Sequence, residues 1–155
     1  MSIEIERKFL VCGPFMDKDL RSTDIIQGYL CIDPSHSVRV RIHGKKGFLT
    51  IKGRGDSTGI SRYEWEKEIA YDEARELLSL CHNFKVEKTR YFVPVGSHTF
   101  EVDVFRGDNE GLIVAEIELD SPDEEFARPD WLGEEVTGDP VYYNASLSKR
   151  PFKMW

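Results

Sequence analysis

Hydrophobic and polar residues alternate with a period of two along most of the chain. In residues 3–11, isoleucine and phenylalanine on one side alternate with glutamate and lysine on the other, as expected for a β-strand. The same alternation, or a short apolar run, returns in residues 25–32, 38–42, 48–52, 62–69, 86–92, 100–104 and 113–120. Turn residues such as glycine, proline and asparagine separate these segments. About eight strands at hairpin spacing predict an antiparallel sheet or barrel.

Helices are few in this pattern. An apolar stripe from Ala74 to Cys81 predicts an amphipathic helix over residues 72–81, with Asp72 as its N-cap. Asp139 and Pro140 form a helix-start signal, and they predict a last helix over residues 141–150. A further short helix is expected between residues 14 and 21. The fold class is therefore α+β with strands dominant, and residues 1–155 are expected to form a single domain.

The polar faces of the predicted strands consist almost entirely of Glu, Asp, Arg and Lys. In an ordinary small barrel the apolar face fills the interior, and these charges would meet solvent. A solvated face usually also contains Thr, Ser and Gln, and the amphipathic helices need an apolar sheet face to cover. We therefore expect an eight-stranded antiparallel β-barrel with a charged lumen and a few covering helices, with a homodimer partner as a further cover of the exterior.

Overall charge at first argues against a polyanionic partner. The chain has 28 acidic and 21 basic residues, a net charge of -7 and a pI of about 5.2. This excess disfavours duplex nucleic acid and acidic membrane surfaces. The sequence begins without an apolar leader, has no spanning apolar run, and its three cysteines suggest neither a disulfide framework nor a zinc site. A cytoplasmic protein is expected.

Two pairs of carboxylates have a spacing that suits a metal ion. Glu4 with Glu6, and Glu116 with Glu118, are two residues apart on predicted strands, so each pair projects to one face. In a barrel the two pairs can converge on one cation. Oxygen-only ligands are hard, and they favour Mg²⁺ or Mn²⁺ over zinc.

Basic residues with the same spacing suit phosphate. Arg39 and Arg41 would present two guanidinium groups, which match phosphate oxygens, on one strand face. Lys8, Lys52 and Lys88 would add point charges on neighbouring strands. A divalent cation together with a polyanionic substrate would compensate a lumen that is otherwise costly to desolvate.

The order of these motifs resembles a known family. Glu4-x-Glu6-x-Lys8 resembles the signature of the CYTH superfamily, the triphosphate tunnel metalloenzymes. The other family motifs follow in order: Arg39-x-Arg41, Leu49 to Gly53, Arg62-x-Glu64-x-Glu66, Lys88-x-Arg90, Glu101-x-Asp103, Glu116-x-Glu118 and Lys149. The resemblance covers essentially the whole chain.

The resemblance implies a tunnel that binds a triphosphate along its axis. Its implied metal ligands are Glu4, Glu6, Glu116 and Glu118, and its implied phosphate cradle is Lys8, Arg39, Arg41, Lys52, Arg90 and Lys149. Three residues are candidates for handling the proton of the attacking water: Lys88, Glu64 and Asp103.

Compact bacterial members of this family, which this chain resembles in length, include inorganic tripolyphosphatases. The resemblance thus implies metal-dependent hydrolysis of a phosphoanhydride bond, with inorganic tripolyphosphate as the expected small-molecule partner. Three alternatives stay open: a class IV-type adenylate cyclase that converts ATP to cyclic AMP, a nucleoside or thiamine triphosphatase, and a non-catalytic polyphosphate binder.

Overall fold

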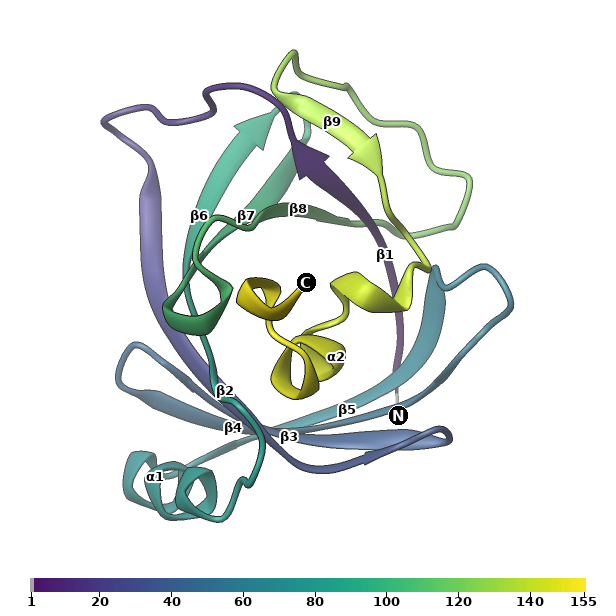
Figure 1. Cartoon of the computed structure of the whole chain (residues 1–155). Coiled ribbons are helices and arrows are strands. Elements are labelled where there is room, and N and C mark those ends of the chain that lie inside the picture. Colours follow the sequence, from purple (N-terminus) through teal and green to yellow (C-terminus); the bar gives the residue numbers. More distant parts are fainter. Residues whose placement is uncertain (1) are drawn as a thin grey trace.

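A computed structural model describes residues 2–155, and its strands curve into a closed antiparallel barrel (Figure 1). The strands are β1 (Ser2–Val11), β2 (Arg21–Asp33), β3 (His36–His43), β4 (Lys46–Gly55), β5 (Ser61–Ile69), β6 (Val86–Val95), β7 (His98–Arg106), β8 (Ile113–Glu118) and β9 (Leu132–Glu135). Their order in the sheet is β5-β4-β3-β2-β6-β7-β8-β1-β9. A further pairing of β5 with β1 closes the first eight strands into a ring, which confirms the predicted barrel.

Strand β1 closes the ring because it pairs with different strands along its two edges. Residues 2–5 pair with β5, while residues 6–10 pair with β8. The end of β1 also pairs with β9, where Phe9 faces Glu135 and Val11 faces Leu132. Strand β9 was not predicted, since its four residues are too few to produce a clear alternation.

Helix α1 (Tyr71–Ser79) lies on the outside of β2, β3 and β4. It begins one residue before the predicted N-cap Asp72, because Glu73 accepts a hydrogen bond from the Ala70 N–H at 3.2 Å. It also ends two residues earlier than predicted. A Cβ added to Gly47 of β4 would lie 2.5 Å from the Ala74 Cβ, so the absence of a side chain at Gly47 permits this close packing.

The C-terminal segment differs from the single helix predicted over residues 141–150. Asp139 does start a helical turn by accepting the Val141 N–H, but this turn is the 3-10 helix η2 (Pro140–Tyr142). Tyr143 is extended, with φ -69° and ψ 137°, and it separates η2 from helix α2 (Asn144–Lys149). Two more 3-10 helices are η1 (Gly107–Asn109) and η3 (Phe152–Met154).

The short helix expected between residues 14 and 21 does not form. A turn in which the Leu20 N–H donates to the Asp17 carbonyl is followed directly by β2 at Arg21. Asp17 also accepts the Asp19 N–H with its side chain, a local bond that competes with helix formation. None of the helices in residues 2–155 is long and apolar enough to cross a membrane.

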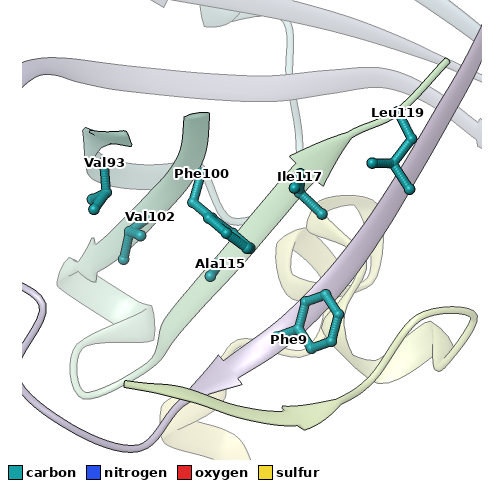
Figure 2. Packing of buried hydrophobic residues seen from close by; sticks show 7 residues of the cluster. All are labelled: Phe9, Val93, Phe100, Val102, Ala115, Ile117 and Leu119. Atoms are coloured by element: carbon teal, nitrogen blue, oxygen red, sulfur yellow. The ribbon is translucent and has the colours of Figure 1, made fainter. Parts of the chain in front are cut away.

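The hydrophobic core lies largely on the outside of the barrel. Figure 2 shows one cluster on β1, β6, β7 and β8 and the segment after β8: Phe9, Val93, Phe100, Val102, Ala115, Ile117 and Leu119. Phe126, Trp131 and Leu132, from the chain after β8, cover it. Helix α1 covers a second cluster that includes Val40 and Ile42. These layers confirm the predicted inverted barrel, with its apolar face outward.

One end of the lumen is apolar, a feature that was not predicted from the sequence. The fully buried Leu147 of α2 packs against Val86, Phe105 and Val114 at this end. Each of these three residues lies two positions from a charged lumen residue on the same face of its strand. Figure 1 shows α2 and the C-terminus within the ring of strands. Helix α2 therefore closes one end of the barrel instead of covering its exterior, and the charged side chains are confined to the remaining part of the lumen.

Candidate active site

A polar cavity of about 220 Å³ occupies the charged part of the lumen. Within the described residues 2–155, seven basic and seven acidic side chains line it. The basic residues are Lys8, Arg39, Arg41, Lys52, Arg62, Lys88 and Arg90, and the acidic ones are Glu4, Glu6, Glu64, Glu66, Glu101, Glu116 and Glu118. The formal charges of the cavity wall therefore cancel, in a chain whose formal net charge is -7.

Strand pairing brings the four predicted metal ligands together on the cavity wall. In the ladder of β1 and β8, Glu6 lies opposite Glu118, and Lys8 lies opposite Glu116. Burial and the neighbouring Glu116 raise the pKa of Glu6 well above its usual value. Burial and the charge of Glu4 likewise raise the pKa of Glu118. This end of the cavity thus concentrates carboxylates that repel one another.

Glu116 is held as a carboxylate. Its burial alone would raise its pKa, but Lys8, whose Nζ lies 3.7 Å away, and Arg90 outweigh that effect and place the pKa far below the usual range. Glu4 is also ionised, because the Lys52 ammonium 2.8 Å away helps to lower its pKa against the effect of burial. Lysines therefore compensate two of the four carboxylates.

The chemistry of the four carboxylates suits a hard divalent cation. Four carboxylates provide only oxygen, and a cation between them would relieve the repulsion that raises the pKa values of Glu6 and Glu118. Across residues 2–155, no three acidic, His or Cys side chains already converge closely enough to hold a metal. Ligation would therefore require rotamer changes, such as movement of Glu4 away from Lys52.

The opposite side of the cavity carries guanidinium groups with unused donors. Arg39 donates to the Thr50 hydroxyl at 3.2 Å, and both Arg39 and Arg41 lie 3.6 Å from Glu66. In the described chain, the buried Nε atoms of Arg39 and Arg41 have no hydrogen-bond acceptor. Burial and the charge of Arg39 lower the pKa of Arg41 to about 10. Such crowded, incompletely satisfied donors are chemically suited to anionic oxygen acceptors.

A buried ion-pair network supports the base of the cavity. Asp103, which is 1% exposed, accepts hydrogen bonds from Arg90 at 2.8 and 3.0 Å and lies 2.7 Å from the Lys88 Nζ. Arg90 also contacts Glu101 at 2.5 Å. Burial would raise the pKa of Asp103, but Arg90 and Lys88 outweigh it and hold the pKa below its usual value. Burial lowers the pKa of Lys88 to about 8.

The structure brings most of the predicted site residues to the cavity, with two exceptions. Asp103 is enclosed behind Lys88 and Arg90 and does not line the cavity. Lys149 ends α2 as an exposed residue, because α2 enters the lumen through its other end and through Leu147. The predicted end of a helix does not show which of its ends points into the lumen, because that direction depends on the tertiary fold.

Several residues that line the cavity had no individual role predicted from the sequence, among them Arg62, Tyr143 and Asn144. Arg62 shares a strand face with Glu64, so the period of two already placed it in the lumen. Tyr143 lies beneath two cations, with its ring 5.4 Å from the Lys8 Nζ and 5.8 Å from the Arg62 guanidinium. Neither Tyr143 nor Asn144 belongs to a strand, and no sequence signal indicated that this segment enters the barrel.

Comparison with known proteins agrees with this architecture. The CYTH domain model matches residues 2–150. An inorganic triphosphatase of Acetivibrio thermocellus is 49% identical over 154 residues, covering 99% of this chain and 97% of that protein. An inorganic triphosphatase of Nitrosomonas europaea is 40% identical over 151 residues, covering 94% and 96%.

Solved structures agree as well. A crystal structure of an inorganic triphosphatase is similar to this fold with a TM-score of 0.69 and 37% identity, and the match covers 96% of this chain and 95% of the other. The strand order, the charged lumen and the extent of the matches lead to the same assignment. The chain belongs to the CYTH domain family.

Proposed function

We propose that this protein is a metal-dependent inorganic triphosphatase that hydrolyses a phosphoanhydride bond of tripolyphosphate. The two relatives described above, at 49% and 40% identity over nearly the whole chain, are inorganic triphosphatases. Triphosphatases of the CYTH family are metal-dependent in general. A small-molecule triphosphate is therefore the expected substrate class.

The observation that carries this proposal is that the cavity holds both unsatisfied basic donors and unsatisfied carboxylates. Buried arginines of β3 have unused donors, and carboxylates of β1 and β8 repel one another. A polyphosphate supplies acceptor oxygens to the first, and its accompanying cation supplies positive charge to the second. A polyphosphate with its cation therefore satisfies both groups of residues in the same cavity.

We assign Glu4, Glu6, Glu116 and Glu118 to the divalent cation and favour Mg²⁺ or Mn²⁺, because all of these ligands are hard oxygen donors. When bound, such a cation supplies Lewis-acid neutralisation of phosphoryl charge. Arg39, Arg41, Arg90, Lys8 and Lys52 would bind and orient the phosphates and stabilise the spread charge of the transition state.

The three candidates for proton handling differ in position. Glu64 lines the cavity and lies 3.5 Å from the Lys52 Nζ, so we propose that it accepts the proton of the attacking water. Lys88 also lines the cavity, and its ammonium would donate to a phosphate oxygen. Asp103 holds Lys88 and Arg90 from behind and acts as a positioning residue. Lys149, at the exposed end of α2, remains a sequence-based prediction for phosphate binding.

The direct test is a substrate panel of tripolyphosphate, ATP, GTP and thiamine triphosphate with Mg²⁺ or Mn²⁺. We expect tripolyphosphate to yield phosphate and pyrophosphate, and chelation of the metal to abolish release. Cyclic AMP and pyrophosphate from ATP would instead identify a cyclase. Stabilisation of the protein by tripolyphosphate without any product would identify a binder and contradict hydrolysis.

Replacement of Arg41 by glutamine should raise the KM for tripolyphosphate about ten- to a hundredfold. The substitution removes a charged hydrogen-bond donor from the anion side of the cavity, and such bonds contribute about 1.5–3 kcal/mol. Arg75→Gln on the exposed surface of α1 is the matched control and should keep the wild-type KM. Steady-state phosphate release measures both variants, and an unchanged KM in Arg41→Gln would remove Arg41 from the proposed cradle.

Two expectations stay predictions from the sequence. They are the cytoplasmic location and the homodimer. The exterior of β1, β4 and β5 leaves Ile3, Ile51, Tyr63 and Trp65 exposed, which is the face that a second copy would cover. Sedimentation equilibrium of the wild-type protein would decide the oligomeric state.

A further inference from the structure

The segment between η2 and α2 contacts two lysines that come from different strands of the barrel. The Lys8 Nζ of β1 donates to the Tyr142 carbonyl at 3.3 Å. The Lys88 Nζ of β6 donates to the Asn144 Oδ1 at 3.1 Å. Tyr143, Asn144 and Ala145 also line the cavity itself. A part of the chain outside the strands thus takes part in placing cations in the lumen.

The Lys88 ammonium is buried and contacts two hydrogen-bond acceptors. It is 1% exposed, and its Nζ contacts Asp103 Oδ2 at 2.7 Å and Asn144 Oδ1 at 3.1 Å. An ammonium group has three N–H donors, so these two acceptors leave one donor for a substrate oxygen. Asn144 restrains the group without neutralising its charge, because an amide oxygen is a neutral acceptor. A second carboxylate there would oppose the approach of a polyanion.

The Asn144 side chain does not cap the start of its own helix. It is the first residue of α2, but α2 has no capping hydrogen bond from a side chain, and its N-cap position is Tyr143. The helix is instead held by Leu147 in the apolar end of the lumen and by a bond from the Phe84 N–H to the Ser148 carbonyl. The Asn144 amide is therefore directed to Lys88 and not required for the start of the helix.

We propose that Asn144 is a positioning residue that, together with Asp103, orients the Lys88 ammonium toward the phosphoryl group being cleaved. This inference rests on the proposed triphosphatase function and adds a residue of the C-terminal segment to it. Orientation of a donor toward developing charge stabilises the transition state more than the ground state. The loss of Asn144 should accordingly affect kcat more than KM.

Kinetics of two substitutions provide the first test. Asn144→Ala should lower kcat for tripolyphosphate about tenfold with KM changed less than about twofold. Asn144→Asp retains an acceptor at the same place, so kcat should stay within about threefold of wild type while KM rises through repulsion of the substrate. Val141→Ala, an exposed position on η2, is the control and should match wild type. Equal loss of kcat in Asn144→Ala and Asn144→Asp, or no loss in Asn144→Ala, would overturn the proposal.

A spectroscopic test separates this inference from the proposed function. In the proton–nitrogen correlation spectrum of the lysine ammonium groups, the Lys88 signal is identified by its disappearance in Lys88→Arg. We expect Asn144→Ala to broaden or shift that signal, and Val141→Ala to leave it unchanged. An unaltered Lys88 signal in Asn144→Ala would refute the inference even in an active enzyme. A wild-type protein that releases no phosphate would refute the proposed function, while the same spectra would still decide whether Asn144 restrains Lys88.

Discussion

Glu116→Gln should lower phosphate release from tripolyphosphate by about a hundredfold or more. Glu116 lies within the carboxylate group of the cavity and keeps a very low pKa because Lys8 and Arg90 outweigh the effect of burial. The amide removes one negative charge from the proposed cation site and leaves Lys8 without the carboxylate 3.7 Å from its Nζ. Both changes weaken the binding of a divalent cation, on which the proposed hydrolysis depends.

The matched control for this substitution is Glu134→Gln, an exposed glutamate on β9. It should keep wild-type turnover. Calorimetric titration with Mn²⁺ should show weaker binding to Glu116→Gln than to the control, and both variants should unfold cooperatively on heating. Near-normal turnover by a folded Glu116→Gln protein would remove Glu116 from the proposed metal ligands.

Asp103→Asn should have the largest effect on stability, a loss of about 3–5 kcal/mol in the free energy of unfolding. Asp103 is 1% exposed and compensates both Lys88 and Arg90. The amide keeps nearly the same shape but leaves two buried cations without their shared counter-charge. Activity should fall as well, since Lys88 and Arg90 lose the group that orients them.

Denaturant unfolding of Asp103→Asn and of Asp24→Asn measures this loss. Asp24 pairs with Arg106 at 3.6 Å on the surface, with both side chains mainly exposed, so its replacement should cost less than about 1 kcal/mol. The folded-state pKa of Asp103 is depressed, so its contribution is present at neutral pH and is lost as pH falls below the unfolded-state value of about 3.9. Equal stabilities of the two variants at pH 7 would contradict the role of Asp103.

The local pattern of apolar and charged residues was sufficient to predict much of this fold. The period of two separates the outward apolar face from the inward charged face in β1, β3, β4, β5, β7 and β8, because the direction of a strand side chain depends on its position alone. Glu4 and Glu6, and likewise Arg39 and Arg41, could thus be assigned to shared faces. Helix boundaries were less accurate, since Glu73 and not Asp72 makes the decisive bond at the start of α1.

Contacts between distant segments were not predictable in this way. Asp103 lies on the predicted face of β7, yet it does not reach the cavity, because Lys88 and Arg90 enclose it. Asn144 is 56 residues from Lys88 in the chain, and no periodic pattern relates the two. Their contact depends on the apolar end of the lumen, where Leu147 is buried among residues of β6, β7 and β8 and their connections.

The sequence by itself determined the inverted barrel, its charged lumen and the residue types available there, because alternation along a strand is a local property of the backbone. Only the tertiary structure decided which charges meet. The closure of β1 against β5 and β8 sets the opposition of Glu6 with Glu118, and the entry of α2 into the lumen directs Asn144 to Lys88 and leaves Lys149 exposed. These arrangements follow from packing among segments far apart in the chain, for which no local pattern exists.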